Sequence, residues 1–117
     1  MLFLEYPPCS TCQKAKKWLE EHNVPYTARH IKENNPTYEE LKIWYTASGL
    51  PLKKFFNTSG LVYKSLNLKE KLPAMSDEEQ LQLLATDGML VKRPLIVTEN
   101  GTILTGFREK DWEAILL

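Results

Sequence analysis

The 117-residue sequence lacks any apolar run near the length of about 18 residues that a membrane-spanning helix needs. It also lacks an excess of either charge, since fifteen Lys and Arg residues balance fifteen Asp and Glu residues. We find no internal repeat, low-complexity tract or linker. These absences argue against contact with a membrane and against nucleic-acid binding that relies on net charge. We therefore expect residues 1–117 to form a single domain, with 43% hydrophobic and 26% charged residues.

Cysteine is scarce, with only Cys9 and Cys12 in the chain. The first five residues lack the basic segment and the long apolar run of a signal peptide, which predicts a cytoplasmic protein. Two closely spaced cysteines in a reducing compartment indicate catalytic or sensing thiols and not a structural disulfide.

The position of the two cysteines makes this indication stronger. Residues 2–6 form an apolar run that predicts a strand, and Ser10 with Gln13 matches a capping box, so we expect a helix to begin at about Ser10. Cys9 would lie at its N-terminus, where free N–H groups and the helix dipole stabilise a thiolate. Cys12 follows one turn later, within reach of a mixed disulfide on Cys9.

The remaining patterns predict the order of the elements. We expect a helix over 10–22, a strand over 24–31, short helices over 37–88, a hairpin of strands 95–98 and 102–104, and a helix over 109–117. Thr37 with Glu40 and Ser76 with Glu79 match capping boxes that would start two of the short helices. Asn23 and Gly88 are expected to end helices, and Ile115 is expected to pack inward. The order βαβ…ββα with a mixed sheet predicts an α/β, thioredoxin-like fold, with a helical insertion of about residues 37–88 between the second and third strands.

Two other interpretations of the cysteines are weaker. A zinc site would need His22 and His30 as further ligands, and their spacing fits no common zinc pattern, so we predict no metal site. Inert buried cysteines are common, but two of them one turn apart at a helix N-terminus are not. Thiol–disulfide chemistry therefore remains the leading hypothesis.

Several segments together resemble the ArsC/Spx family over essentially the whole chain. They are the cysteine motif followed by Lys14-Ala15, the segment from Phe56-Asn57-Thr58 to Tyr63-Lys64, the run Lys92-Arg93-Pro94-Leu95-Ile96-Val97, and Leu104-Thr105-Gly106-Phe107. That family holds arsenate reductases that work with glutaredoxin and the Spx/MgsR transcription regulators.

The resemblance implies a role for each residue of the cysteine loop. Cys9 would be the nucleophile and Cys12 the second thiol, with Ser10 and Thr11 contacting the substrate. Pro94 would follow a cis peptide bond and lie against this loop, and the backbone beside it would hold an extended substrate or partner near the thiol.

Three arginines bind the oxyanion in the arsenate reductases that the chain resembles. Arg93 matches one of them, and we expect it to lower the pKa of Cys9 and to bind an oxyanion or a glutathione carboxylate. The second position holds Asn57. The third would fall close to Gly106, and Arg108 lies two residues further on.

We therefore carry three functional hypotheses. The first is a cytoplasmic thiol–disulfide oxidoreductase that acts on a small thiol, an oxyanion or a protein disulfide. It would hold no cofactor and would be reduced by glutathione and glutaredoxin or by thioredoxin. The second is an Spx-like redox regulator that binds the RNA polymerase α subunit through a surface containing Gly49, although Trp44 replaces an expected basic residue. The third is an arsenate reductase.

Overall fold

The computed structural model describes residues 1–117 and is built on a four-stranded mixed sheet. The strands are β1 (Leu2–Glu5), β2 (Thr27–His30), β3 (Leu95–Val97) and β4 (Ile103–Thr105), in the order β2-β1-β3-β4. β1 pairs with β2 in parallel, whereas β1–β3 and β3–β4 are antiparallel. The parallel pair requires a crossover, which α1 (Ser10–Glu21) provides.

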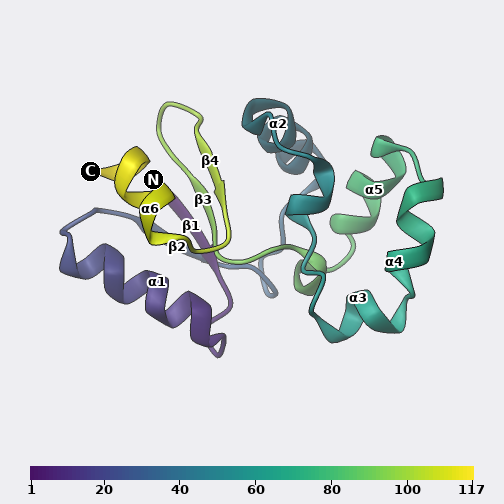
Figure 1. Ribbon diagram of the computed structural model, residues 1–117, viewed down its shortest axis with the longest axis horizontal. Coiled ribbons are helices and arrows are strands. Elements are labelled where there is room, and N and C mark those ends of the chain that lie inside the picture. The colour runs from purple at the N-terminus through teal and green to yellow at the C-terminus, as the bar shows by residue number, and fades with distance from the viewer.

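Helices cover both faces of this sheet (Figure 1). Helix α1 lies on one side together with α6 (Glu109–Leu116), and the helical insertion lies on the other. The insertion consists of α2 (Tyr38–Ser48), η1 (Leu52–Phe55), α3 (Leu61–Ser65), α4 (Leu68–Lys71), η2 (Leu72–Ala74), α5 (Asp77–Leu84) and η3 (Gly88–Leu90). The predicted thioredoxin-like order of elements is confirmed.

Successive strand residues point to opposite faces and so build two apolar clusters. Phe3 and Ile96 pack with α1 and with Trp112 of α6 in a cluster of six buried residues. Leu4 and Leu95 belong to a cluster of sixteen that the insertion shares with the sheet. The sheet therefore joins the two helical layers.

Two of the predicted helix starts are confirmed in detail. Thr37 and Glu40 form a complete capping box at the start of α2, and Ser76 and Glu79 form another at the start of α5. Asn23 follows α1 with a φ of 54°, as expected of a residue that ends a helix.

Other expectations were wrong at element ends. The second strand covers only Thr27–His30 and not residues 24–31, since β1 offers partners to four residues alone. Gly88 does not end α5, which stops at Leu84. It begins η3, where a Cβ would lie 1.8 Å from the carbonyl oxygen of Ile31. Ile115 is 47% exposed because the short α6 buries only one stripe, centred on Trp112.

Polar contacts fasten the insertion to the rest of the fold. The Arg29 guanidinium of β2 donates to both carboxylate oxygens of Glu40 in α2, at 2.7 and 2.9 Å. The Asn35 amide donates to the carbonyl of Ala85, and Phe56 pairs with Val91 in an isolated bridge. None of the helices combines the length and the apolar character needed to cross a membrane.

Candidate functional site

The first turn of α1 leaves its N–H groups free of any side-chain cap. Cys9 is the N-cap residue, with extended backbone angles, and its carbonyl accepts the first helical hydrogen bond from Gln13 at 3.0 Å. The expected Ser10–Gln13 capping box was therefore wrong, and the Gln13 amide instead donates to the carbonyl of Pro7 at 3.0 Å. Because no side chain occupies the helix N-terminus, its N–H groups can stabilise a charge on Cys9.

The two thiols differ in burial and in acidity. Burial raises the pKa of Cys9, whereas hydrogen bonds from the backbone N–H and the thiol of Cys12 lower it. The N–H of Thr11 and the charge of Arg93 act in the same direction, so the pKa of Cys9 falls below its usual value. Cys12 is completely buried, and burial raises its pKa to about 12. Cys9 is thus the thiol that ionises first.

Arg93 adds an unpaired positive charge beside this thiol. It precedes Pro94 through a cis peptide bond, as the family resemblance implied. Its guanidinium lies 5.1 Å from the centre of the Tyr6 ring. The Nε and Nη1 atoms are buried and have no hydrogen-bond partner, and no carboxylate pairs with the side chain. Arg93 can therefore receive an anionic group next to Cys9.

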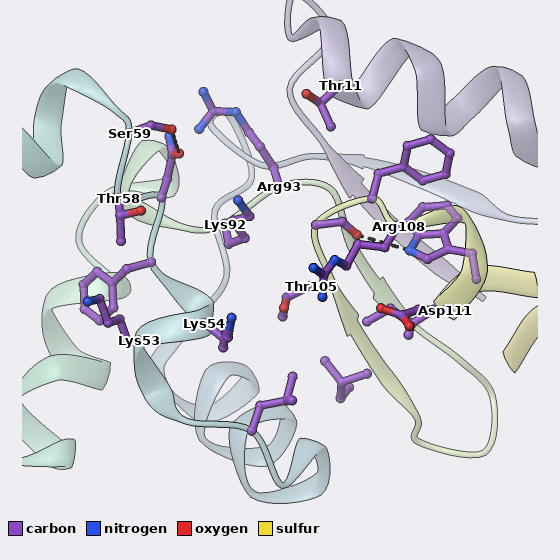
Figure 2. A pocket seen from close by; sticks show the side chains of 18 of the residues that line it. Thr11, Lys53, Lys54, Thr58, Ser59, Lys92, Arg93, Thr105, Arg108 and Asp111 are labelled. Atoms are coloured by element: carbon purple, nitrogen blue, oxygen red, sulfur yellow. Dashed lines mark hydrogen bonds between the residues drawn. The ribbon is translucent and has the colours of Figure 1, made fainter. Parts of the chain in front are cut away.

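Cys9 opens into a groove of about 1130 Å³ between the insertion and the α6 side of the fold. Residues 50–51, 53–54 and 56–60 line the insertion wall, whereas residues 103–108 with part of α6 line the other. Figure 2 shows Thr11 and Arg93 toward one end of this groove, with Lys53 and Lys54 toward the other.

The groove brings together most of the residues singled out from the sequence. Cys9, Thr11, Asn57, Arg93 and Arg108 all line it. Asn57 belongs to the insertion wall, and its N–H donates to the carbonyl of Leu90 at 2.7 Å.

The other predicted site residues lie outside the groove lining. Ser10 is exposed, Cys12 is buried behind Cys9, and Pro94 is buried, with its carbonyl accepting from the Gly106 N–H. Gly49 is exposed at the end of α2, with a φ of 66°.

Sequence reasoning missed four contributors to this site. Lys53, Lys54 and Lys92 line the groove, and Tyr6 lies under the Arg93 guanidinium. The Lys53-Lys54 and Lys92-Arg93 pairs were visible signals of local positive charge. Only the tertiary fold shows that both pairs enter one groove. No group of three or more His, Cys, Asp or Glu side chains is arranged to hold a metal ion.

Comparison with known proteins defines the class. The profile of the ArsC family matches residues 4–115. The chain therefore belongs to the ArsC family.

Individual relatives include a regulatory protein and a solved structure related to the ArsC family. The chain is 58% identical over 113 residues to YusI of Bacillus subtilis, covering 97% of this chain and 95% of YusI. It is 32% identical over 107 residues to the regulatory protein MgsR of the same organism, covering 92% of this chain and 82% of MgsR. A crystal structure of an ArsC family related protein from Bacteroides fragilis superposes with a TM-score of 0.93 at 65% identity, covering 97% of this chain and 94% of that one.

Proposed function

We propose that the protein is a thiol–disulfide oxidoreductase in which Cys9 attacks and Cys12 resolves. The observation that carries the proposal is the placement of the two thiols. Cys9 occupies the uncapped N-terminus of α1 and faces the groove, whereas Cys12 is buried one turn behind it. A nucleophile needs access and a stabilised thiolate, and a resolving thiol needs only to reach the bond that the nucleophile forms.

The reaction has two exchange steps. The Cys9 thiolate attacks one sulfur of a disulfide, forms a mixed disulfide and releases the other sulfur as a thiolate. Cys12 then loses its proton and attacks the Cys9 sulfur, which releases the second thiol and leaves a Cys9–Cys12 disulfide. The substrate gains two electrons and the protein loses them, so an external dithiol or two thiols must reduce the protein again.

Arg93 supports the first step in two ways. Its charge favours the Cys9 thiolate, and its unpaired N–H groups can bind an anionic part of the substrate. We propose that the chemistry needs no bound cofactor, that glutathione with glutaredoxin or thioredoxin supplies the electrons, and that the protein acts in the cytoplasm.

The cysteine variants test this order of events. Cys12→Ser should react once with glutathione disulfide and stay as a mixed disulfide, which intact mass spectrometry detects as one added glutathione. Cys9→Ser should form no adduct, and wild type should pass on to the Cys9–Cys12 disulfide. An adduct on Cys9→Ser but not on Cys12→Ser would reverse the two roles.

A redox regulator is the second candidate, favoured by the similarity to MgsR. Gly49 is exposed at the end of α2 with open space around it, and Ile43 of the same helix is 65% exposed. A regulator of this kind should capture the RNA polymerase α subunit from cytosol on the tagged protein, and Gly49→Arg should abolish the capture. Partners that only a reductant releases would support the oxidoreductase instead.

Arsenate reduction is the third candidate. The groove holds Arg93 and Arg108 but has Asn57 on the insertion wall. We therefore expect no arsenate turnover above background with glutathione and glutaredoxin. Turnover that depends on Cys9 and Arg93 would establish the activity.

A further inference from the structure

The groove is far more positive than the chain as a whole. It is lined by five cationic side chains and a single carboxylate, whereas basic and acidic residues balance over the full sequence. The cationic residues come from η1, from the segment before β3 and from the start of α6; they are Lys53, Lys54, Lys92, Arg93 and Arg108. The carboxylate is that of Asp111.

None of these five side chains forms an ion pair or a side-chain hydrogen bond within the protein. The salt bridges all lie elsewhere and involve Glu99, Glu5, Glu40 and Glu33. Figure 2 shows Lys54, Lys92 and Arg108 reaching into the groove from different elements. The Lys92 side chain lies close to Gly106, in the turn before α6, since a Cβ added to Gly106 would be 3.1 Å from the Cε of Lys92. The positive charge is thus concentrated in a groove whose single carboxylate, that of Asp111, forms no ion pair with any of the five cations.

The dimensions of the groove exceed what a single small anion would occupy. Sites for small ligands commonly have volumes of about 300–1,000 Å³, and this groove has about 1130 Å³. Apolar side chains from both walls, among them Leu50, Phe56, Phe107 and the half-exposed Ile115, line the groove together with the cations. A surface that mixes apolar and cationic groups along a groove fits a chain of several residues that itself mixes apolar and acidic side chains.

We propose that the groove takes an acidic, extended peptide segment next to the reactive cysteine of a protein disulfide. Lys54, Lys92 and Arg108 bind the carboxylates of that segment, away from the Cys9 end where the sulfur reacts. This inference rests on the proposed oxidoreductase function and gives it a substrate class. Opposite charge raises the rate of encounter and favours matching partners, and salt weakens both effects.

Two peptides of one length test the preference. Each has one cysteine in a mixed disulfide with 2-thiopyridine, and one carries glutamates where the other carries glutamines. The Cys9 thiolate attacks the peptide sulfur and releases pyridine-2-thione, and Cys12 then releases the peptide thiol and forms the Cys9–Cys12 disulfide. Release of pyridine-2-thione gives the rate of the first step, and release of the peptide thiol gives the second.

The acidic peptide should react about tenfold faster than the glutamine peptide at low salt, and the ratio should fall toward one at high salt. In the Lys54→Gln/Lys92→Gln variant the ratio should fall toward one even at low salt. The control Lys69→Gln/Lys71→Gln removes the same charge from exposed residues of α4, outside the groove, and should keep the wild-type ratio. The glutamine peptide is the internal reference for each variant.

Three results would overturn the inference. Wild type could react equally with both peptides, the Lys54→Gln/Lys92→Gln variant could keep the full ratio, or the control could lose it to the same extent. Failure of the oxidoreductase function itself has a different signature, because the peptide would then stay bound to Cys9 and no Cys9–Cys12 disulfide would form. The charge preference of the first step would still be measured in that case.

Discussion

The two walls of the groove differ in how their residues are held. On the wall of the sheet with α1 and α6, the proposed reactive groups are held by a helix N-terminus and by an aromatic contact. Cys9 is an N-cap residue, and the Arg93 guanidinium lies over the Tyr6 ring. On the insertion wall, Lys53 and Lys54 are exposed side chains of a single 3₁₀ turn. The sheet wall therefore holds the proposed reactive groups together with cations such as Arg108, whereas the insertion wall adds the exposed charges of Lys53 and Lys54.

Because of this difference, we expect substitutions in the two regions to affect different properties of the protein. Substitutions in the sheet wall should change the reactivity of Cys9, and substitutions in the insertion should change partner choice or stability. The insertion has short helices but shares a cluster of sixteen buried residues with the sheet. The packing of the insertion against the sheet, and not the stability of its helices alone, should therefore hold the insertion wall of the groove in place.

The largest effect should follow a change at the junction of the two regions. In Gly88→Ala the new Cβ would meet the Ile31 carbonyl at 1.8 Å, so η3 and the end of β2 would have to separate. We expect a loss of about 3 kcal/mol or more in the free energy of unfolding, measured by urea denaturation. Gly49→Ala is the control, because Gly49 has a positive φ but nothing within 4 Å. It should cost only about 1 kcal/mol, and equal losses would contradict the junction argument.

Substitution of a buried tryptophan in each region, Trp112 in α6 or Trp44 in α2, should have smaller and unequal effects on the free energy of unfolding. Trp112 is 1% exposed, and its Nε1 donates to the carbonyl of Gly106 at 3.2 Å. Trp112→Phe loses volume and leaves that carbonyl without its indole partner, which should cost about 2 kcal/mol in urea denaturation. Trp44 in α2 is 7% exposed and forms no side-chain hydrogen bond, so Trp44→Phe should cost about 1 kcal/mol. The opposite order would show that the insertion depends more on its tryptophan.

Arg93→Gln should change reactivity more than stability. Loss of the charge removes one of the influences that lower the pKa of Cys9, so that pKa should rise. The rate of alkylation by neutral iodoacetamide should therefore reach its plateau at higher pH. Loss of the contact with Tyr6 should cost about 1 kcal/mol of stability. Arg108→Gln removes a groove charge that is not among the causes of the shift, so an equal change there would refute the specific role of Arg93.

Local signals in the sequence were sufficient for the order of the elements along the chain and for several helix ends. Three helix ends depend only on neighbouring residues and can be predicted from the sequence. They are the capping boxes at Thr37 and Ser76 and the end of α1 before Asn23. The cis bond before Pro94 followed from the family resemblance and not from local chemistry.

Failures occurred where a contact outside the matched sequence pattern decides the outcome. Glycine is a common residue at helix ends, which is why Gly88 was expected to end one. The close approach of the Ile31 carbonyl, just after β2, instead requires a glycine at the start of η3. Ser10 and Gln13 have the spacing of a capping box, but Gln13 bonds to Pro7 because the chain turns back before the helix. Convergence of the lysines on one groove could not be predicted for the same reason.

The smallest expected effect concerns the ion pair that crosses between the two regions. Hydrogen bonds from Arg29 hold the pKa of Glu40 at about 2, below its usual 4.5. A depressed carboxyl pKa stabilises the fold above the unfolded-state pKa, and this stabilisation is lost as pH falls toward the folded-state pKa. Because Glu40 is partly exposed, we expect Glu40→Gln to cost only about 0.5 kcal/mol at neutral pH. Glutamine can preserve the capping box with Thr37, so the loss reports the ion pair.

The pH dependence of that loss identifies its origin. Urea denaturation of wild type and Glu40→Gln should give curves that differ above pH 4.5 and converge as the pH falls toward 2. Glu79→Gln, at the matching capping box of α5, lacks an ion pair and should give a smaller difference. A difference for Glu40→Gln that persists unchanged to low pH would mean that packing, and not charge, joins β2 to α2. The insertion wall would then be held to the sheet by its apolar cluster alone.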